Sequence, residues 1–292
     1  MNEPVALDSA WISANPLPVH GGGTTKDSRG HVVVIGGGRS VPGALRLTVE
    51  AALGAGAGKV QFATIASAAM LLGVMIPEAG AIGTAETPDG EIAAGANAEL
   101  EKALSRCDVA IVGPGMASSE AAAPVLRQVL GSAPEVTLLV DAVAIAGARE
   151  LRDALAAFGG ALIFTPHHGE MAGLLGRDVD TVRAAPAEAA RAAAESYGAT
   201  IVLKGSDTVI STPDGRMLHY GGGGVGLATS GSGDVLAGAI AGLASRGADP
   251  LVAAAWGVWL HGQAGRRLAT SPGPIGFLAR ALPGEFPSLL PQ

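Results

Sequence analysis

The segment Gly221–Asp234, GGGGVGLATSGSGD, has the residue types and spacing best suited to chemistry in this chain. It opens directly into an Ala/Leu/Ile-rich helical stretch, so Gly231, Ser232 and Gly233 would expose successive backbone N–H groups at a helix N-terminus. Such groups bind anionic oxygens, which predicts an anion hole. Asp234 falls in the first turn, where the helix N-terminus favours an ionised carboxylate beside the anion. A plain helix cap is the alternative interpretation, since Asp and Ser are favoured at helix starts.

Lys204 is a second candidate, because it ends an apolar stretch, precedes a glycine in LKGSDT and is one of only four lysines. Two interpretations stay open. Its ammonium would neutralise a nucleotide phosphate, or it would snorkel at the end of a strand. The four glycines at the start of Gly221–Gly226 favour a mobile loop that covers a phosphate.

Other polar residues also follow apolar stretches. His167, in TPHHGE, is placed as a ligand contact, and Glu170 as a cap of the next helix. Asp141 ends VTLLVD and is a candidate for contact with a polar group or a metal-bound water. His261, within a helical stretch, is interpreted as a core histidine. A single cysteine, Cys107, argues against a zinc site, and no serine occupies a G-x-S-x-G elbow.

These residues must be positioned by short apolar strands that alternate with Ala-rich helices. Repeated strand–helix units predict an α/β fold with three αβα layers and a mainly parallel sheet, whose carboxyl edge binds the ligand. TPDG at Thr212–Gly215 predicts a hairpin. The expected strands are His31–Ile35, Lys59–Thr64, Asp108–Val112, Val136–Asp141, Ala161–Thr165, Thr200–Leu203, Asp207–Ser211 and Arg216–Tyr220. The expected helices are Gly43–Gly54, Ala98–Arg106, Glu120–Leu130, Ala148–Phe158, Ala187–Tyr197, Ser232–Arg246 and Pro250–Ala269.

No linker or repeat divides the chain, which predicts one domain over residues 25–292 after a frayed extension over residues 1–24. Hydrophobic residues make up 48% and charged residues 15%, which excludes a disordered chain. The net charge of −7 argues against nucleic acid or an anionic membrane as a partner. The uncharged run Val60–Pro77 is interpreted as a buried strand and a short helix rather than a membrane span.

The lone cysteine, which fits a reducing compartment, and the acidic, proline-containing start predict a cytoplasmic protein. Few charges in Pro250–Ala269 and Pro274–Leu282 predict a homo-oligomer, with these segments between subunits. The glycine-rich segment Gly36–Ala44 matches neither of two common phosphate-binding motifs. It lacks the Lys-Ser/Thr ending of a P-loop and the third glycine of G-x-G-x-x-G. A hydride-transferring Rossmann enzyme is therefore disfavoured.

Seven motifs occur in one order over about residues 25–283: PGA, GPG, DA, TPHHGE, LKGSDTVISTPDGR, LATSGSGDVLAGAIAGL and GVWLHGQAG. In this order they resemble those of the ADP-dependent NAD(P)H-hydrate dehydratases, a branch of the ribokinase-like superfamily. The resemblance implies a ribokinase-like fold and a stand-alone dehydratase, because the residues before it are too few for the epimerase domain that some relatives carry. His168 stands where the family usually has a proline, and Ser230 where it usually has a glycine.

The resemblance also implies a reaction. ADP, with Mg²⁺, is the co-substrate that phosphorylates the hydroxyl of the S-epimer of hydrated NADH or NADPH, and loss of phosphate restores NAD(P)H and leaves AMP. Asp234 would deprotonate that hydroxyl. The nucleotide contacts implied are Lys204, Gly205, Ser206, Asp207, Thr208 and Gly233. The contacts implied for the hydrated dinucleotide are Ala44, Gly115, His167 and Asp234.

Two other functions stay open. A ribokinase-like vitamin or sugar kinase would use ATP with a similar anion hole and the same aspartate, although TPHHGE and LKGSDT match the dehydratases more closely. A catalytically silent nucleotide sensor is the second, because Gly221–Gly226 departs from the family pattern. A product assay separates all three.

Overall fold

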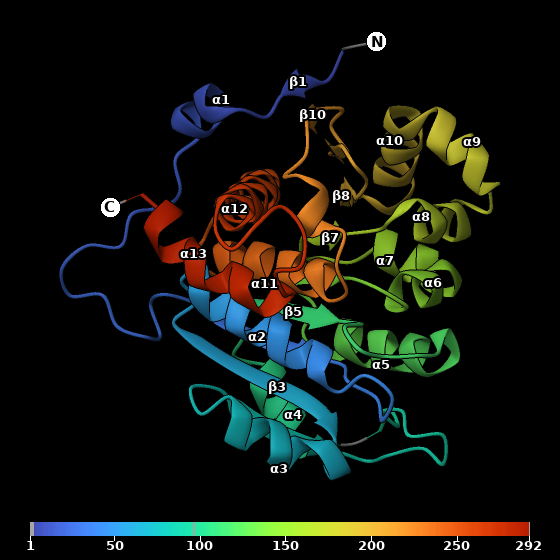
Figure 1. Ribbon diagram of the computed structural model, residues 1–292. Helices are drawn as coiled ribbons and strands as arrows, with labels where there is room; N and C mark the ends of the chain where they lie inside the picture. The colour runs from blue at the N-terminus through green and yellow to red at the C-terminus, as the bar shows by residue number, and fades with distance from the viewer. Residues whose placement is uncertain (1–2, 96, 292) are drawn as a thin grey trace.

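The computed structural model describes residues 3–95 and 97–291, and one ten-stranded sheet forms its centre (Figure 1). The strand order is β1-β10-β9-β8-β7-β6-β5-β2-β3-β4, and β9 alone runs against the other described strands. The strands are β1 Val5–Ala6, β2 His31–Ile35, β3 Lys59–Ile65, β4 Gly80–Thr84, β5 Val109–Val112, β6 Thr137–Val140, β7 Leu162–Phe164, β8 Thr200–Leu203, β9 Thr208–Ser211 and β10 Met217–Tyr220. The predicted mainly parallel sheet is confirmed, with the hairpin between β9 and β10.

Helices cover both faces of the sheet, which gives the predicted three layers (Figure 1). One face carries α2, α11, α12 and α13, and the other carries α5, α6, α8 and α10. The α-helices are α1 Ser9–Ala14, α2 Gly43–Gly54, α3 Ala66–Met75, α4 Ala98–Leu104, α5 Ser119–Ser132, α6 Ala144–Ala148, α7 Arg152–Ala156, α8 His168–Leu175, α9 Val179–Ala184, α10 Pro186–Tyr197, α11 Ser232–Ser245, α12 Pro250–Thr270 and α13 Leu282–Leu289. Short 3-10 turns are η1 Arg149–Leu151, η2 Val225–Leu227 and η3 Ala279–Ala281.

Small residues allow α11, which carries the predicted anion hole at its start, to pack closely against α2. A Cβ on Gly238 would lie 2.1 Å from the carbonyl oxygen of Thr48, and one on Gly242 would lie 2.5 Å from that of Ala52. These glycines therefore allow backbone contact between the two helices, as the Gly- and Ala-rich sequence predicts. Both helices begin at the carboxyl edge of the sheet, so their N-termini open toward the same side.

The N-terminal segment is ordered against the sheet, which corrects the expectation of a frayed start. The β1 strand pairs in parallel with β10, and Asp8 caps α1. Leu7 and Ile12 are buried, and the indole N–H of Trp256 donates to the carbonyl of Asn15 at 2.8 Å. Residues 1 and 2 of the expected extension lie outside the described residues, and the domain boundary at residue 25 stays a prediction.

Two elements differ from the sequence-based expectation because tertiary contacts decide them. The strand β4, GAIGT, lacks a strong strand signal, and it forms by pairing with β3 at the edge of the sheet. The single helix expected over Ala148–Phe158 is split, because Leu151 leaves helical geometry at φ −110° and ψ 16° and buries its side chain.

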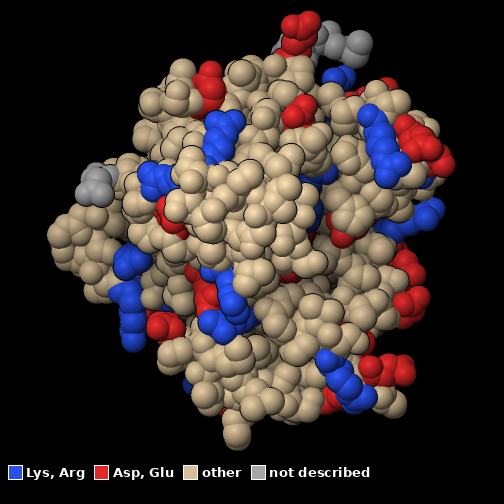
Figure 2. Space-filling model, viewed as in Figure 1, with Lys and Arg blue, Asp and Glu red and all other residues tan. Residues whose placement is uncertain are grey.

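Two surface features bear on function. No described helix is long and apolar enough to cross a membrane. On the face shown in Figure 2, Lys and Arg side chains are dispersed among Asp and Glu with broad uncharged areas between them, so this face offers no continuous basic surface.

Candidate active site

A buried ion pair at the carboxyl edge joins the ends of β6 and β8, the two strands that flank β7. Asp141 follows β6 and Lys204 follows β8, and the Lys204 ammonium donates to Asp141 Oδ1 at 2.8 Å. Thr165, after β7, donates its hydroxyl to the same oxygen at 2.6 Å. The side chain of Asp141 is 2% exposed and that of Lys204 is 20% exposed, so the lysine does not snorkel into solvent. Of the two interpretations of Lys204, the structure favours the one that places it inside the site.

The backbone next to Asp141 has an unusual conformation. Ala142 is the one described non-glycine residue with a positive φ, at 52°. Gly113 faces it with φ 125°, and a Cβ on Gly113 would lie 1.9 Å from the carbonyl oxygen of Asp141. Strained backbone of this kind is found mainly where the surrounding structure imposes a functional geometry.

The start of α11 lies beside Lys204, as required for an anion hole. Gly231 is the N-cap residue with φ 87°, and a Cβ there would lie 2.3 Å from Leu47, so this position requires glycine. A Cβ on Gly233 would lie 3.4 Å from Lys204 Nζ. Among the described residues, the N–H groups of Gly231 and Gly233 donate to no protein acceptor, while the N–H of Asp234 faces its own carboxyl. These two N–H groups and the Lys204 ammonium are therefore the candidate donors to an anion at the start of α11.

Ser232 does not contribute its amide to this site, which corrects the predicted anion hole. Its N–H donates to the carbonyl of Thr229 at 3.2 Å, and its Oγ lies 3.0 Å from His261 Nε2. Burial lowers the pKa of His261 to about 4, so this imidazole is neutral. The interpretation of His261 as a core histidine is confirmed.

Asp234 is in the first turn of α11, as predicted, but its charge state differs from the expectation. Gly231 rather than Asp234 caps the helix. Burial, followed by repulsion from Asp141, raises the pKa of Asp234 to about 7, while the nearby Lys204 acts in the opposite direction. The helix N-terminus therefore does not keep this carboxyl fully ionised. A carboxylate with a pKa near neutrality is well suited to accept a proton.

His167 and Glu170 form a capping box at the start of α8. His167 Nδ1 accepts the N–H groups of Gly169 and Glu170 at 3.0 and 3.1 Å, and Glu170 Oε2 accepts the N–H of His167 at 2.8 Å. The expected cap by Glu170 is confirmed, and His167 shares in it. The other ring nitrogen of His167, Nε2, lies 3.4 Å from Glu170 Oε1, and the side chain is 60% exposed, so one side of the ring is open to a ligand.

Ala44, at the start of α2, and Gly115, in the loop after β5, lie against each other. A Cβ on Gly115 would lie 3.0 Å from Cβ of Ala44. The N–H groups of Gly37 and Gly38 donate to the carbonyls of Pro114 and Gly115, both at 2.8 Å, which ties the loops after β2 and β5 together. The two residues predicted to line the dinucleotide site thus form one surface.

The segment predicted to contact the nucleotide divides in two. Gly205, Ser206 and Asp207 are exposed in the loop between β8 and β9, while Thr208 is buried inside β9. This loop adjoins the glycine run, because a Cβ on Gly222 would lie 2.5 Å from the carbonyl oxygen of Ser206. Gly223 and Gly226 pack against α12 and Phe277, so close packing accounts for part of that run.

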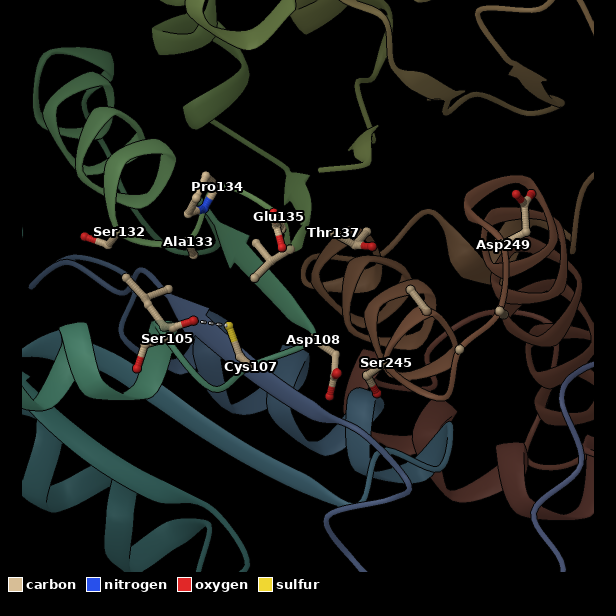
Figure 3. A pocket seen from close by; sticks show the side chains of 15 residues that line it. Ser105, Cys107, Asp108, Ser132, Ala133, Pro134, Glu135, Thr137, Ser245 and Asp249 are labelled. Carbon is tan, nitrogen blue, oxygen red and sulfur yellow. Dashed lines mark hydrogen bonds between the residues drawn. The ribbon is translucent and has the colours of Figure 1, made fainter. Parts of the chain in front are cut away.

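A hollow of about 740 Å³ lies at the other edge of the sheet, away from Asp141, Lys204 and Asp234 (Figure 3). Its lining includes Cys107 and Asp108, at the start of β5. The thiol donates to the carbonyl of Leu104 at 3.3 Å, and burial raises the pKa of Cys107 to about 12. Asp108 accepts the backbone N–H of His31 at 2.7 Å. Most of the lining residues precede β5 and β6, at the amino ends of these strands, so this hollow is not the predicted site.

No group of three or more His, Cys, Asp or Glu side chains among the described residues could hold a metal ion.

The chain is similar to characterised proteins over nearly its whole length. The profile of the NAD(P)H-hydrate dehydratase family matches residues 32–287. An ADP-dependent (S)-NAD(P)H-hydrate dehydratase of Xanthomonas campestris is 46% identical over 284 residues, which cover 97% of this chain and 95% of that protein. The chain spans about half the length of the bifunctional NAD(P)H-hydrate repair enzymes that it also matches.

Solved structures agree with the sequence relatives. An ADP/ATP-dependent NAD(P)H-hydrate dehydratase of Bacillus subtilis, co-crystallised with ATP and Mg²⁺, is 27% identical with a TM-score of 0.79 and covers 99% of this chain and 98% of its own. A ribokinase-like superfamily protein of Enterococcus faecalis is 26% identical with a TM-score of 0.77, over 94% of this chain and 90% of its own. The predicted ribokinase-like fold is confirmed, and the chain belongs to the NAD(P)H-hydrate dehydratase family.

Proposed function

We propose that this protein uses ADP to dehydrate the S-epimer of hydrated NADH or NADPH, which regenerates NAD(P)H and releases AMP and phosphate. The observation that carries the proposal is the position of Asp234. Its carboxyl has a pKa of about 7 and lies in the first turn of α11, beside the free N–H of Gly233 and the ammonium of Lys204. The names of the similar proteins in Xanthomonas and Bacillus support the same reaction.

In the proposed first step Asp234 accepts the proton of the substrate hydroxyl. The hydroxyl oxygen then bonds to the β-phosphorus of ADP, and the bond from that phosphorus to AMP breaks. In the second step the ring C–O bond breaks, phosphate leaves and a ring proton is lost, which restores the double bond of NAD(P)H. Phosphorylation is required because hydroxide is a poor leaving group and phosphate a good one.

The cationic side of the site would hold the nucleotide. Lys204 and the N–H groups of Gly231 and Gly233 face the region where phosphoryl oxygens would gather charge in the transition state. We assign the exposed loop Gly205–Asp207 to the rest of the nucleotide. The wall formed by Ala44 and Gly115, with the exposed side of His167, is assigned to the hydrated dinucleotide.

One assay tests the proposal against its alternatives. Hydrated NADH is incubated with the protein and ADP, and recovery of absorbance at the NADH band is followed with AMP release. A small alcohol phosphorylated by ATP would identify a kinase instead. Nucleotide binding with no turnover of either substrate would identify a sensor.

Three finer points stay proposals. Mg²⁺ is expected to accompany the nucleotide, and the cytoplasm is expected as the compartment. A homo-oligomer is also expected. Of the two segments predicted to lie between subunits, most of α12 is buried within the chain, while Pro274–Leu282 exposes Ile275 and Leu278. A further candidate surface is α3, where four apolar side chains are half to four-fifths exposed: Met70, Leu71, Val74 and Met75.

A further inference from the structure

Three carboxyl groups act on the charge of Lys204: Asp141 most strongly, then Glu170, then Asp234. Its ammonium is bonded to Asp141 Oδ1 at 2.8 Å, and it also lies close to the first turn of α11, which carries Asp234. Among the described residues, the ion pair of Lys204 is with Asp141 and not with Asp234. The catalytic carboxyl is thus left without a salt-bridge partner.

The pair with Asp141 is held firmly in place. Asp141 is fixed by the hydroxyl of Thr165 at 2.6 Å and by the strained turn at Ala142. Its side chain is 2% exposed, so water offers the carboxylate no alternative partner. The backbone N–H of Lys204 donates to the carbonyl of Pro166 at 2.7 Å, which anchors the lysine at the end of β8.

We infer that Asp141 is a positioning residue that occupies the Lys204 ammonium, and thereby keeps Asp234 free to act as a base. This inference rests on the proposed function, in which Asp234 takes the substrate proton. Without the charge of Asp141, the flexible lysine side chain would be drawn to the carboxyl groups that remain around it, Glu170 on α8 and, in the first turn of α11, Asp234. An ion pair with Asp234 would hold the base in its charged form and weaken it.

The charged and titratable groups around Asp234 can be named. Asp141 after β6, Glu170 on α8 and Lys204 after β8 act on its charge, and burial raises its pKa further. The two carboxyl groups raise the pKa of Asp234 and the lysine lowers it. Removing the charge of Asp141 takes away one group that raises the pKa of Asp234. It also frees Lys204, which lowers that pKa, so both changes lower the pKa of Asp234.

The test compares Asp141→Asn with a matched control, Thr165→Val. Asparagine keeps the size of Asp141 and an acceptor for Thr165 but removes the charge. The control removes one hydrogen bond to Asp141 and leaves its charge. In Asp141→Asn, the acid limb of kcat/KM for hydrated NADH should move down by at least about one pH unit, with a lower plateau rate. In Thr165→Val the limb should stay in place, and an unmoved limb in Asp141→Asn would overturn the inference.

Two further variants keep the test decisive if Asp141→Asn folds poorly. Lys204→Met removes the lowering charge and should move the acid limb upward, opposite to Asp141→Asn. The double variant Asp141→Asn with Lys204→Met removes both opposing charges and should return the limb close to that of the wild type. Equal downward shifts in both single variants would show a general structural effect and overturn the inference.

A readout without turnover separates this inference from the proposed function. The difference in melting temperature between Asp234→Asn and the parent protein, followed against pH, reports where Asp234 titrates in the folded state. In an Asp141→Asn background this difference should level off at lower pH and at a smaller value, because the folded-state pKa of Asp234 then lies closer to its unfolded value. If the wild type regenerates no NADH with ADP, the proposed function fails, while this titration still tests whether Asp141 occupies Lys204.

Discussion

The Lys204 ammonium lies against Gly233, close enough that a Cβ on this glycine would come within 3.4 Å of Nζ. Gly233 is the second residue of α11, and its N–H donates to no described protein acceptor. A cation and an unpaired amide thus face one small space. If a phosphate occupies this space, the start of α11 is a binding site; otherwise it is an ordinary helix terminus.

Gly233→Ala should separate these two interpretations. The new methyl group would make only ordinary contact with the lysine, and replacing a helical glycine typically stabilises by about 0.5–1 kcal/mol. The melting temperature should therefore be unchanged or higher, while the methyl group takes space needed by a phosphate oxygen and weakens ADP binding at least about tenfold. Calorimetric titration with ADP measures this. The control is Gly173→Ala in α8, where no atom lies within 4 Å, and which should bind ADP normally.

Asp234→Asn should remove the base while keeping its size. We expect NADH recovery to fall by roughly 100- to 10,000-fold, the usual effect of losing a general base. ADP should bind as well as before or more tightly, because a carboxyl beside the phosphates is gone. A stable variant with near-normal turnover would show that Asp234 only supports the helix start.

The same variant should change how stability depends on pH. Because the pKa of Asp234 is raised from 3.8 to about 7 in the folded state, the native protein holds this proton between about pH 4 and 7 while the unfolded chain has lost it. Native stability therefore falls as the pH rises through this window. Asp234→Asn should melt higher than the wild type by a few degrees at pH 8, and the difference should vanish near pH 4. A constant difference across the range would contradict the raised pKa.

Nucleotide binding should raise the melting temperature of the wild-type protein. ADP or AMP at 100 times its dissociation constant should add about 2.7 kcal/mol to the free energy of unfolding. Lys204→Met should lose most of this gain because a cation facing the phosphates is removed. Its own stability must be compared with the double variant in which Asp141→Asn removes the unpaired charge. Melting curves unmoved by millimolar ADP, AMP or ATP would count against the site.

The exposed apolar face of α3 should bury itself between subunits. Four of its side chains are at least half exposed, and no acid or base lies between Val60 and Pro77. Light scattering at micromolar concentration should give a multiple of 28.7 kDa, and Leu71→Lys with Val74→Lys should reduce it. A wild-type mass of 28.7 kDa would contradict the expected homo-oligomer.

The sequence by itself determined the architecture and the location of the site. Alternating apolar runs and Ala-rich helices predicted the sheet and its layers, because local periodicity follows directly from which faces are buried. SGSGD before a long helix placed Asp234 in the first turn of α11, and LKGSDT placed Lys204 at the end of β8. These features depend on residues close together in the chain, which is why pattern and spacing reveal them.

Only the tertiary structure decided how the site is charged. Asp141 and Lys204 are 63 residues apart, and their pairing requires the order of β6, β7 and β8 in the sheet. The pKa of Asp234 depends on its burial and on both of these neighbours, so the helix start alone predicts an ionised carboxylate where the fold produces a weaker acid. The hydroxyl of Ser232 lies against His261 because α12, which carries this histidine, packs against α11. Desolvation and long-range contacts have no signature in a local sequence pattern, and they set the chemistry of this site.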